Sequence, residues 1–179
     1  MKNGITKEEA ELVFSEHSAF VYRQVLLITR SKVLAEDITQ ETFIRVFGNY
    51  HKYDTTRPIR PWIYRIASNV AYNALRREKW RSYIGAIPEG EGFNPVENAI
   101  LESEEEKELF REIDRLSFKG RQVVILHFFS GLKMHEIAEM LGIPIGTCKS
   151  RLNAALASLR ERLGRDDLRI AGGKSCDAN

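Results

Sequence analysis

Apolar residues recur every three or four positions along most of the chain, a spacing typical of amphipathic helices. The first such segment starts at Thr6, a capping residue that has Glu9 three positions later. A second covers residues 33–47 and a third runs over residues 61–81. The positions expected to face inward are Leu12, Val13, Phe20, Val21, Val25 and Ile28, then Leu34, Ile38, Phe43, Val46 and Phe47, then Ile63, Ile66, Ala67, Val70 and Ala74. The pattern predicts an all-α protein.

The helical period continues in the second half of the chain. Leu109, Phe110, Ile113 and Leu116 predict one helix, and residues 119–129 predict another. Two further helices, over residues 134–141 and 145–163, are separated only by a short break. Gly142 suits the end of the first and Pro144 the start of the second. This arrangement predicts a helix-turn-helix.

The second helix of that pair carries small polar and basic residues on its first turns. A helix that offers such side chains can enter the major groove of DNA and contact base edges and phosphates. An ordinary helical hairpin with a basic exposed end remains an alternative from this segment alone. The residues expected to bind duplex DNA are Thr147, Lys149, Ser150, Arg151 and Asn153.

Residues 82–95 are rich in Gly and Pro and have no hydrophobic period, so we expect a flexible linker there. The chain then divides into two small helical domains, residues 1–81 and 96–165, followed by a frayed tail over residues 166–179. An acidic block follows the linker. It is either the solvated start of a helix or a segment that keeps the linker away from DNA, and the sequence leaves its role open.

The region before and within the third helix combines aromatic, amide and basic side chains. Residues 49–61 are interrupted by prolines and predict a loop able to receive a base. Between Arg60 and Arg81, six basic residues against one acidic residue give a net charge of +5. This mixture suits single-stranded or melted nucleic acid, although Trp62 fits a core position better than a stacking platform. The candidate contacts are Tyr53, Arg57, Arg60, Arg65, Asn69, Asn73, Arg76 and Arg77.

Composition narrows the class of protein. The 179 residues carry a formal net charge of only +2, so the distribution of charge matters more than its sum. Two cysteines and no apolar leader or spanning segment predict a cytoplasmic protein without membrane insertion. His135 and Glu136 begin a string like that of zinc proteases, but Glu139 stands where the second His is needed. We therefore expect no enzyme activity, metal, cofactor or small-molecule substrate.

Three segments also resemble the sigma factors of bacterial RNA polymerase. The string EIAEMLGIPIGTCKSRL, residues 136–152, resembles the helix-turn-helix that binds the promoter −35 element, and WIYRIASN, residues 62–69, resembles the region that melts and reads the −10 element. The string AEDITQETF, residues 35–43, is similar to the region that grips the clamp of the polymerase largest subunit. Their joint order identifies the chain as similar to the extracytoplasmic-function group of sigma factors.

The resemblance implies partners and roles. It implies binding to the clamp and flap of core RNA polymerase, to promoter DNA and to an anti-sigma factor. A stand-alone helix-turn-helix regulator is the alternative, but it would leave the two upstream segments unexplained. The chain has Ala154 and Leu156 where the family often has basic residues, so we expect weaker phosphate anchoring. The implied polymerase contacts are Asp37, Gln40, Glu41 and Arg45.

Overall fold

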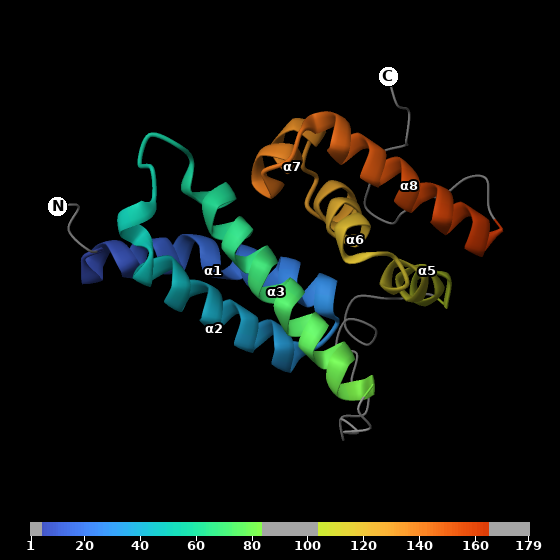
Figure 1. Ribbon diagram of the computed structural model, residues 1–179, viewed down its shortest axis with the longest axis horizontal. Helices are drawn as coiled ribbons and strands as arrows, with labels where there is room; N and C mark the ends of the chain where they lie inside the picture. Colours follow the sequence, from blue (N-terminus) through green and yellow to red (C-terminus); the bar gives the residue numbers. More distant parts are fainter. Residues whose placement is uncertain (1–4, 84–103, 165–179) are drawn as a thin grey trace. The chain divides into compact units, whose positions relative to one another are not determined.

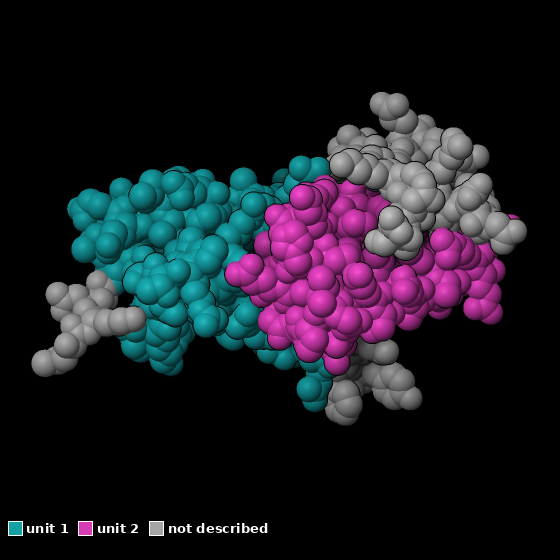
Figure 2. Space-filling view, turned by 90° about the horizontal axis from the view of Figure 1, so that it is seen from above, with its two compact units in different colours: residues 1–95 teal, residues 96–179 magenta. Residues whose placement is uncertain are grey.

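The computed structural model describes residues 5–83 and 104–164, and every regular element within these two ranges is a helix. The chain divides into two compact units, residues 1–95 and 96–179, coloured separately in Figure 2. The predicted all-α class is confirmed. No helix within the two described ranges is both long and apolar enough to cross a membrane.

Unit 1 is built from three long helices, α1 (Lys7–Thr29), α2 (Lys32–Gly48) and α3 (Ile59–Tyr83), which pack against one another (Figure 1). The predicted cap at the start of α1 is confirmed: the Thr6 hydroxyl accepts from the Glu9 N–H, and the Glu9 carboxylate accepts from the Thr6 N–H. Ser31 starts α2 in a related way, because its hydroxyl accepts from the Leu34 N–H.

The core of unit 1 follows the predicted faces with one clear error. Leu12 was expected to face inward, but it is 58% exposed, whereas its neighbour Val13 is buried. The two positions differ by about 100° around the helix, so burying Val13 on the line of Val21 and Val25 turns Leu12 outward. Phe20 is only half-buried.

Buried polar residues in unit 1 escaped the hydrophobic pattern. Thr39 and Thr42 on α2 are buried, and each hydroxyl donates to the carbonyl four residues earlier, at 2.6 Å in both cases. These bonds satisfy the hydroxyls inside the unit. A threonine whose hydroxyl bonds to a helical carbonyl can therefore lie in the core, although a pattern of apolar residues does not predict it there.

The loop before α3 is shorter than predicted. Tyr50–Lys52 forms a 3-10 turn, and α3 begins at Ile59 instead of after the loop's end at residue 61. Pro61 is tolerated in the first turn because the first four N–H groups of a helix have no partner within it. At its other end α3 runs to Tyr83, two residues into the predicted linker. The rest of that linker, like the tail over residues 166–179, lies outside the described residues.

Unit 2 contains α5 (Glu104–Asp114), α6 (Phe118–Val124), the π-helical turn η2 (Ile125–Phe129), α7 (Met134–Leu141) and α8 (Ile145–Leu163). The single helix predicted over residues 119–129 is thus an α-helix that continues as a π-turn. Ser117 caps α6 by accepting from the Gly120 N–H at 3.2 Å.

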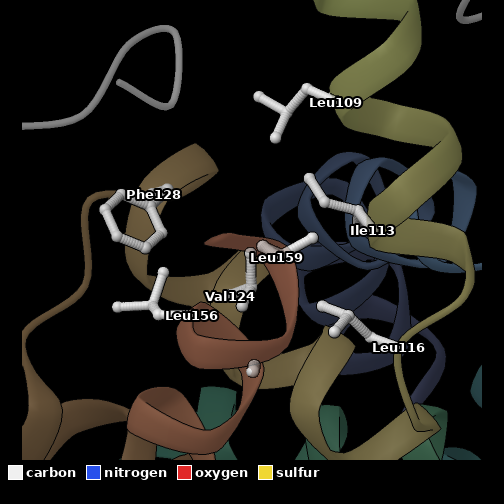
Figure 3. Close-up of a cluster of buried hydrophobic side chains, with 8 residues drawn as sticks. Leu109, Ile113, Leu116, Val124, Phe128, Leu156 and Leu159 are labelled. Carbon is white, nitrogen blue, oxygen red and sulfur yellow. The ribbon is translucent and has the colours of Figure 1, made fainter. Parts of the chain in front are cut away.

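A hydrophobic cluster joins α5, α6 and α8 in unit 2 (Figure 3). Leu109 and Ile113 on α5 point toward Val124 on α6 and toward the side chains of Leu156 and Leu159 on α8. Because α5, α6 and α8 share this core, the exposed face of α8 is held in a fixed position relative to α5 and α6.

Candidate nucleic-acid interface

The predicted helix-turn-helix is present in unit 2. Helix α7 ends at Gly142, which has a φ of 66°, and the next residue's N–H donates to the Ala138 carbonyl at 3.0 Å. Pro144 then precedes the first residue of α8. Cys148 is buried between the two helices, with its sulfur 3.9 Å from the Met134 sulfur. The turn and this contact fix the angle at which α8 leaves α7.

The five residues predicted to bind duplex DNA lie on the solvent side of α8, but they do not form a single strip. Ser150 and Asn153 are exposed and lie opposite the buried stripe. With 3.6 residues per turn, Lys149 and Arg151 fall on opposite flanks of that exposed face. Thr147 is half-buried and lies on the Arg151 side, with its carbonyl accepting from the Ser150 hydroxyl at 3.0 Å. The helix therefore has a small polar centre and a cation on each side.

A second polar strip runs along α3 in unit 1. Arg65, Asn69, Asn73 and Arg76 are all exposed and recur at helical spacing on one face. Tyr72, which is 46% exposed, lies in the same strip. The candidate set from the sequence omitted this tyrosine, although its helical spacing from Asn69 and Arg76 was the signal that could have included it. Arg77 is exposed beside the strip.

Two basic candidates before this strip are placed differently. Arg57 is exposed in the loop, and its Nε lies 3.4 Å from an Asp54 carboxylate oxygen. The guanidinium of Arg60 sits 3.7 Å above the ring of Phe20 from α1. This cation–π contact holds Arg60 on a different side of α3 from Arg65.

Tyr53 is not at the surface, which differs from the expectation that it offers a ring to a base. It is 7% exposed, its ring centroid lies 5.7 Å from that of Tyr50, and its hydroxyl donates to the Arg57 carbonyl. Burial raises the pKa of the Tyr53 phenol, and the neighbouring Tyr50 and Asp54 add to the rise. Trp62 is half-buried and packs on the same ring. Tyr53 thus braces the loop from within.

The residues predicted to contact polymerase share one side of α2. Asp37, Gln40 and Arg45 are exposed and Glu41 is half-buried. Arg45 Nε donates to a Glu41 carboxylate oxygen at 2.6 Å. Gln40 also lines a shallow depression of about 340 Å³ between α1 and α2, together with Tyr22 and other residues of both helices. This side of unit 1 offers polar groups around a hollow, which suits a protein partner better than a nucleic acid.

In the part of the chain that the structure describes, no group of three or more His, Cys, Asp or Glu side chains is placed to hold a metal ion. Burial also raises the pKa of the Cys148 thiol, although the nearby Arg151 opposes that rise. This thiol lies inside the helix-turn-helix and faces no open site.

Comparison with known proteins gives one match in each unit. Residues 13–81 match the family described as Sigma-70 region 2, and residues 106–159 match Sigma-70 region 4. A stand-alone helix-turn-helix regulator would account only for the second match, so that alternative is set aside.

Individual relatives agree with this division. The ECF RNA polymerase sigma factor SigW of Bacillus subtilis is 34% identical over 141 residues, covering 72% of this chain and 75% of the relative. SigL of Mycobacterium tuberculosis, also an ECF RNA polymerase sigma factor, is 32% identical over 167 residues, covering 88% of this chain and 92% of SigL.

The fold is that of a solved sigma factor. RpoE from Bartonella quintana, determined in complex with the anti-sigma factor NepR, aligns with a TM-score of 0.67 at 21% identity and covers 88% of this chain and 98% of its own. Sigma factors are transcription factors and not enzymes. The chain belongs to the extracytoplasmic-function (ECF) group of RNA polymerase sigma factors.

Proposed function

We propose a division of labour within this sigma factor, which directs promoter-specific transcription initiation by core RNA polymerase. Unit 1 binds the polymerase through α2 and reads the −10 element through α3, and unit 2 reads the −35 element through α8. The observation that carries this proposal is that each unit exposes polar and basic side chains suited to DNA, as a strip on α3 and as a polar centre flanked by two cations on α8.

On the −35 element, the first turns of α8 enter the major groove. That groove is about 12 Å wide and a helix with its side chains is about 10–12 Å across, so the two flanks of α8 face the phosphate walls. Lys149 and Arg151 are then placed for phosphates, while Thr147, Ser150 and Asn153 face base edges. Each well-placed bidentate base contact contributes about 1–3 kcal/mol of discrimination.

On the −10 element, the α3 strip receives the separated strand. Asn69 and Asn73 offer both donors and acceptors to base edges, and Tyr72 offers a surface on which a base can stack, worth about 1–3 kcal/mol. Such contacts offset the few kcal/mol needed to extrude a base. The cations assigned to backbone phosphates are Arg57, Arg60, Arg65, Arg76 and Arg77. Tyr53 acts indirectly, by holding the loop in shape.

Core polymerase is bound by the side of α2 that carries Asp37 and Gln40. The Glu41–Arg45 pair on the same side is solvent-accessible and contributes little to folding. The pair can therefore open at small cost to the fold. Glu41 and Arg45 can then each bind a group on the polymerase, at the clamp or the flap.

The same reading assigns no covalent chemistry to the chain, because its work is binding and strand opening. It acts where the polymerase acts, in the cytoplasm. An anti-sigma factor is a further proposed partner, and the support for it is the family resemblance together with the complex of RpoE with NepR.

Run-off transcription from a promoter library, with purified core polymerase, tests the proposal. We expect sequence-specific starts only when the chain is added. The double change Asp37→Ala with Gln40→Ala should weaken comigration with core at least several-fold, whereas Glu11→Ala, an exposed change on α1, should leave it intact. Absence of starts, together with duplex binding that needs no core polymerase, would overturn the proposal.

A further inference from the structure

An arginine-lined groove of about 290 Å³ follows one flank of α8 in unit 2. Arg151 and Arg162 border it from α8, and Arg115 borders it from the connection between α5 and α6. Two serine hydroxyls, those of Ser117 and Ser158, also line it. The groove thus gathers three guanidinium groups from positions that are far apart in the sequence.

Small residues keep the groove open. Helix α6 lies close to α8 at Gly120, where an added Cβ would lie 3.4 Å from the Ala155 Cβ and 3.3 Å from the Ser117 hydroxyl oxygen. Ala154 lies on the groove side of α8 as well. It is one of the two positions where the family often carries basic residues, so here a methyl group leaves space between the three arginines.

The charge of the groove is only partly balanced. Glu112, which is 8% exposed, pairs with two of the three arginines, with one carboxylate oxygen 2.5 Å from Arg115 Nη1 and the other 3.7 Å from Arg162 Nη1. Within the described residues, Arg151 has no carboxylate at ion-pair distance. Arg115 and Arg162 share one buried carboxylate and Arg151 has none, which leaves a net charge of about +2 among these four groups.

We propose that this groove binds backbone phosphate of the DNA duplex that α8 reads, with Arg115 and Arg162 supplying the cations that the first turns of α8 lack. The inference rests on the proposed reading of the −35 element. Arginine suits the ligand because its planar fork can donate two parallel hydrogen bonds to a phosphate.

The placement of the groove favours DNA over a free phosphate compound. Arg151 follows Ser150 directly and occupies the flank of α8 that faces one wall of the major groove. From Arg151 to Arg162 the helix rises about 16 Å, whereas phosphates along one strand recur about every 3.4 Å of the duplex axis. The groove is therefore long enough to follow a strand beyond a single phosphate.

The test uses holoenzyme on duplex promoter DNA and measures the dissociation constant from low to moderate salt. Each phosphate contact contributes about −0.9 to the slope of log affinity against log salt for duplex DNA. We expect Arg115→Gln and Arg162→Gln each to make the slope shallower by about that amount. Arg160→Gln is the matched control, because it removes the same charge from the same turn of α8 on the opposite flank.

Because Glu112 is buried, removing one of its arginines leaves a carboxylate with less compensation and could unfold unit 2. The double variant Glu112→Gln with Arg162→Gln removes both charges of that pair and should give the same shallower slope in a folded protein. Arg162→Lys, which keeps the charge, should restore most of the slope.

The outcomes separate the two proposals. Slopes for Arg115→Gln, Arg162→Gln and the double variant that equal the Arg160→Gln slope overturn the groove, while −35 sequence discrimination by the wild type still supports the reading by α8. If the wild-type holoenzyme shows no −35 sequence discrimination, that result counts against the proposed function. If inorganic pyrophosphate raises the melting temperature of the wild type but not of the double variant, and all slopes stay equal, the groove binds a free phosphate compound and the DNA assignment is wrong.

Discussion

The ring of Tyr53 lies against the indole of Trp62, with 5.1 Å between ring centroids and 31° between ring planes. One residue belongs to the loop after α2 and the other to the first turn of α3, so the contact ties the loop to the helix that carries the proposed −10 strip. Tyr50 approaches both rings, at 5.7 and 6.3 Å between centroids. The loop is thus held by aromatic packing from inside.

Graded changes at Tyr53 should separate packing from its hydroxyl. Tyr53→Phe keeps the ring and removes the hydroxyl with its hydrogen bond to the Arg57 carbonyl, which should lower the free energy of unfolding by about 1 kcal/mol and leave promoter opening near normal. Tyr53→Ala removes the ring and should cost about 3–5 kcal/mol, with a loss of open complexes. Urea unfolding and an open-complex assay check both. Normal opening by a stable Tyr53→Ala protein would contradict the bracing role.

Two neighbouring positions on α8 should behave differently. Arg151→Ala should weaken binding to all −35 sequences alike and make the salt slope shallower by about 0.9. Asn153→Ala should relax the preference at one base pair by about 1–3 kcal/mol and leave the slope unchanged. Binding of holoenzyme to a set of single-base promoter variants at several salt concentrations distinguishes them. A uniform loss for Asn153→Ala would place that residue on the backbone.

The stability of unit 1 should depend on the protonation of His17. Burial lowers the pKa of His17 below 6.5, Glu16 opposes this and Arg60 adds to it. Because the folded state then binds fewer protons than the unfolded state, the contribution is fully present above pH about 6.5 and is lost as the pH falls toward the lower folded pKa. Urea unfolding between pH 5 and 8 should show this decline, and His17→Gln should flatten it. His51→Gln, an exposed change, is the control. An equally steep decline in His17→Gln would exclude this histidine.

Local signals predicted much of the fold. Thr6 with Glu9 fixed the start of α1, and Gly142 with Pro144 fixed the turn before α8, because caps and turns depend on residues close together in the chain. The burial of Tyr53 could not be predicted in the same way. It depends on the packing of the Tyr53 ring against Tyr50 and Trp62, which forms only in the folded unit. From the sequence alone, an aromatic residue in a polar loop suits either a buried or an exposed position.

Local sequence patterns also do not predict the arginine groove. Arg115 and Arg151 are 36 positions apart (151 minus 115), and the packing of α5 and α6 on α8 brings their two elements together. The first turns of α8 carry few cations, which predicts weak phosphate anchoring. Tertiary structure brings Arg115, from the connection between α5 and α6, beside Arg151 and Arg162 of α8.

The thiol of Cys148 should report on the integrity of the helix-turn-helix. It is buried against Met134, and burial raises its pKa, so little thiolate is present at neutral pH. In a Cys176→Ser background the native protein should react with a thiol reagent at least about tenfold more slowly than the urea-unfolded chain, because reaction needs α7 and α8 to separate. Binding of −35 duplex by holoenzyme should slow it further. Equally fast reaction of native and unfolded protein would show that the two helices do not stay packed, and α8 would then lack the fixed orientation that base reading requires.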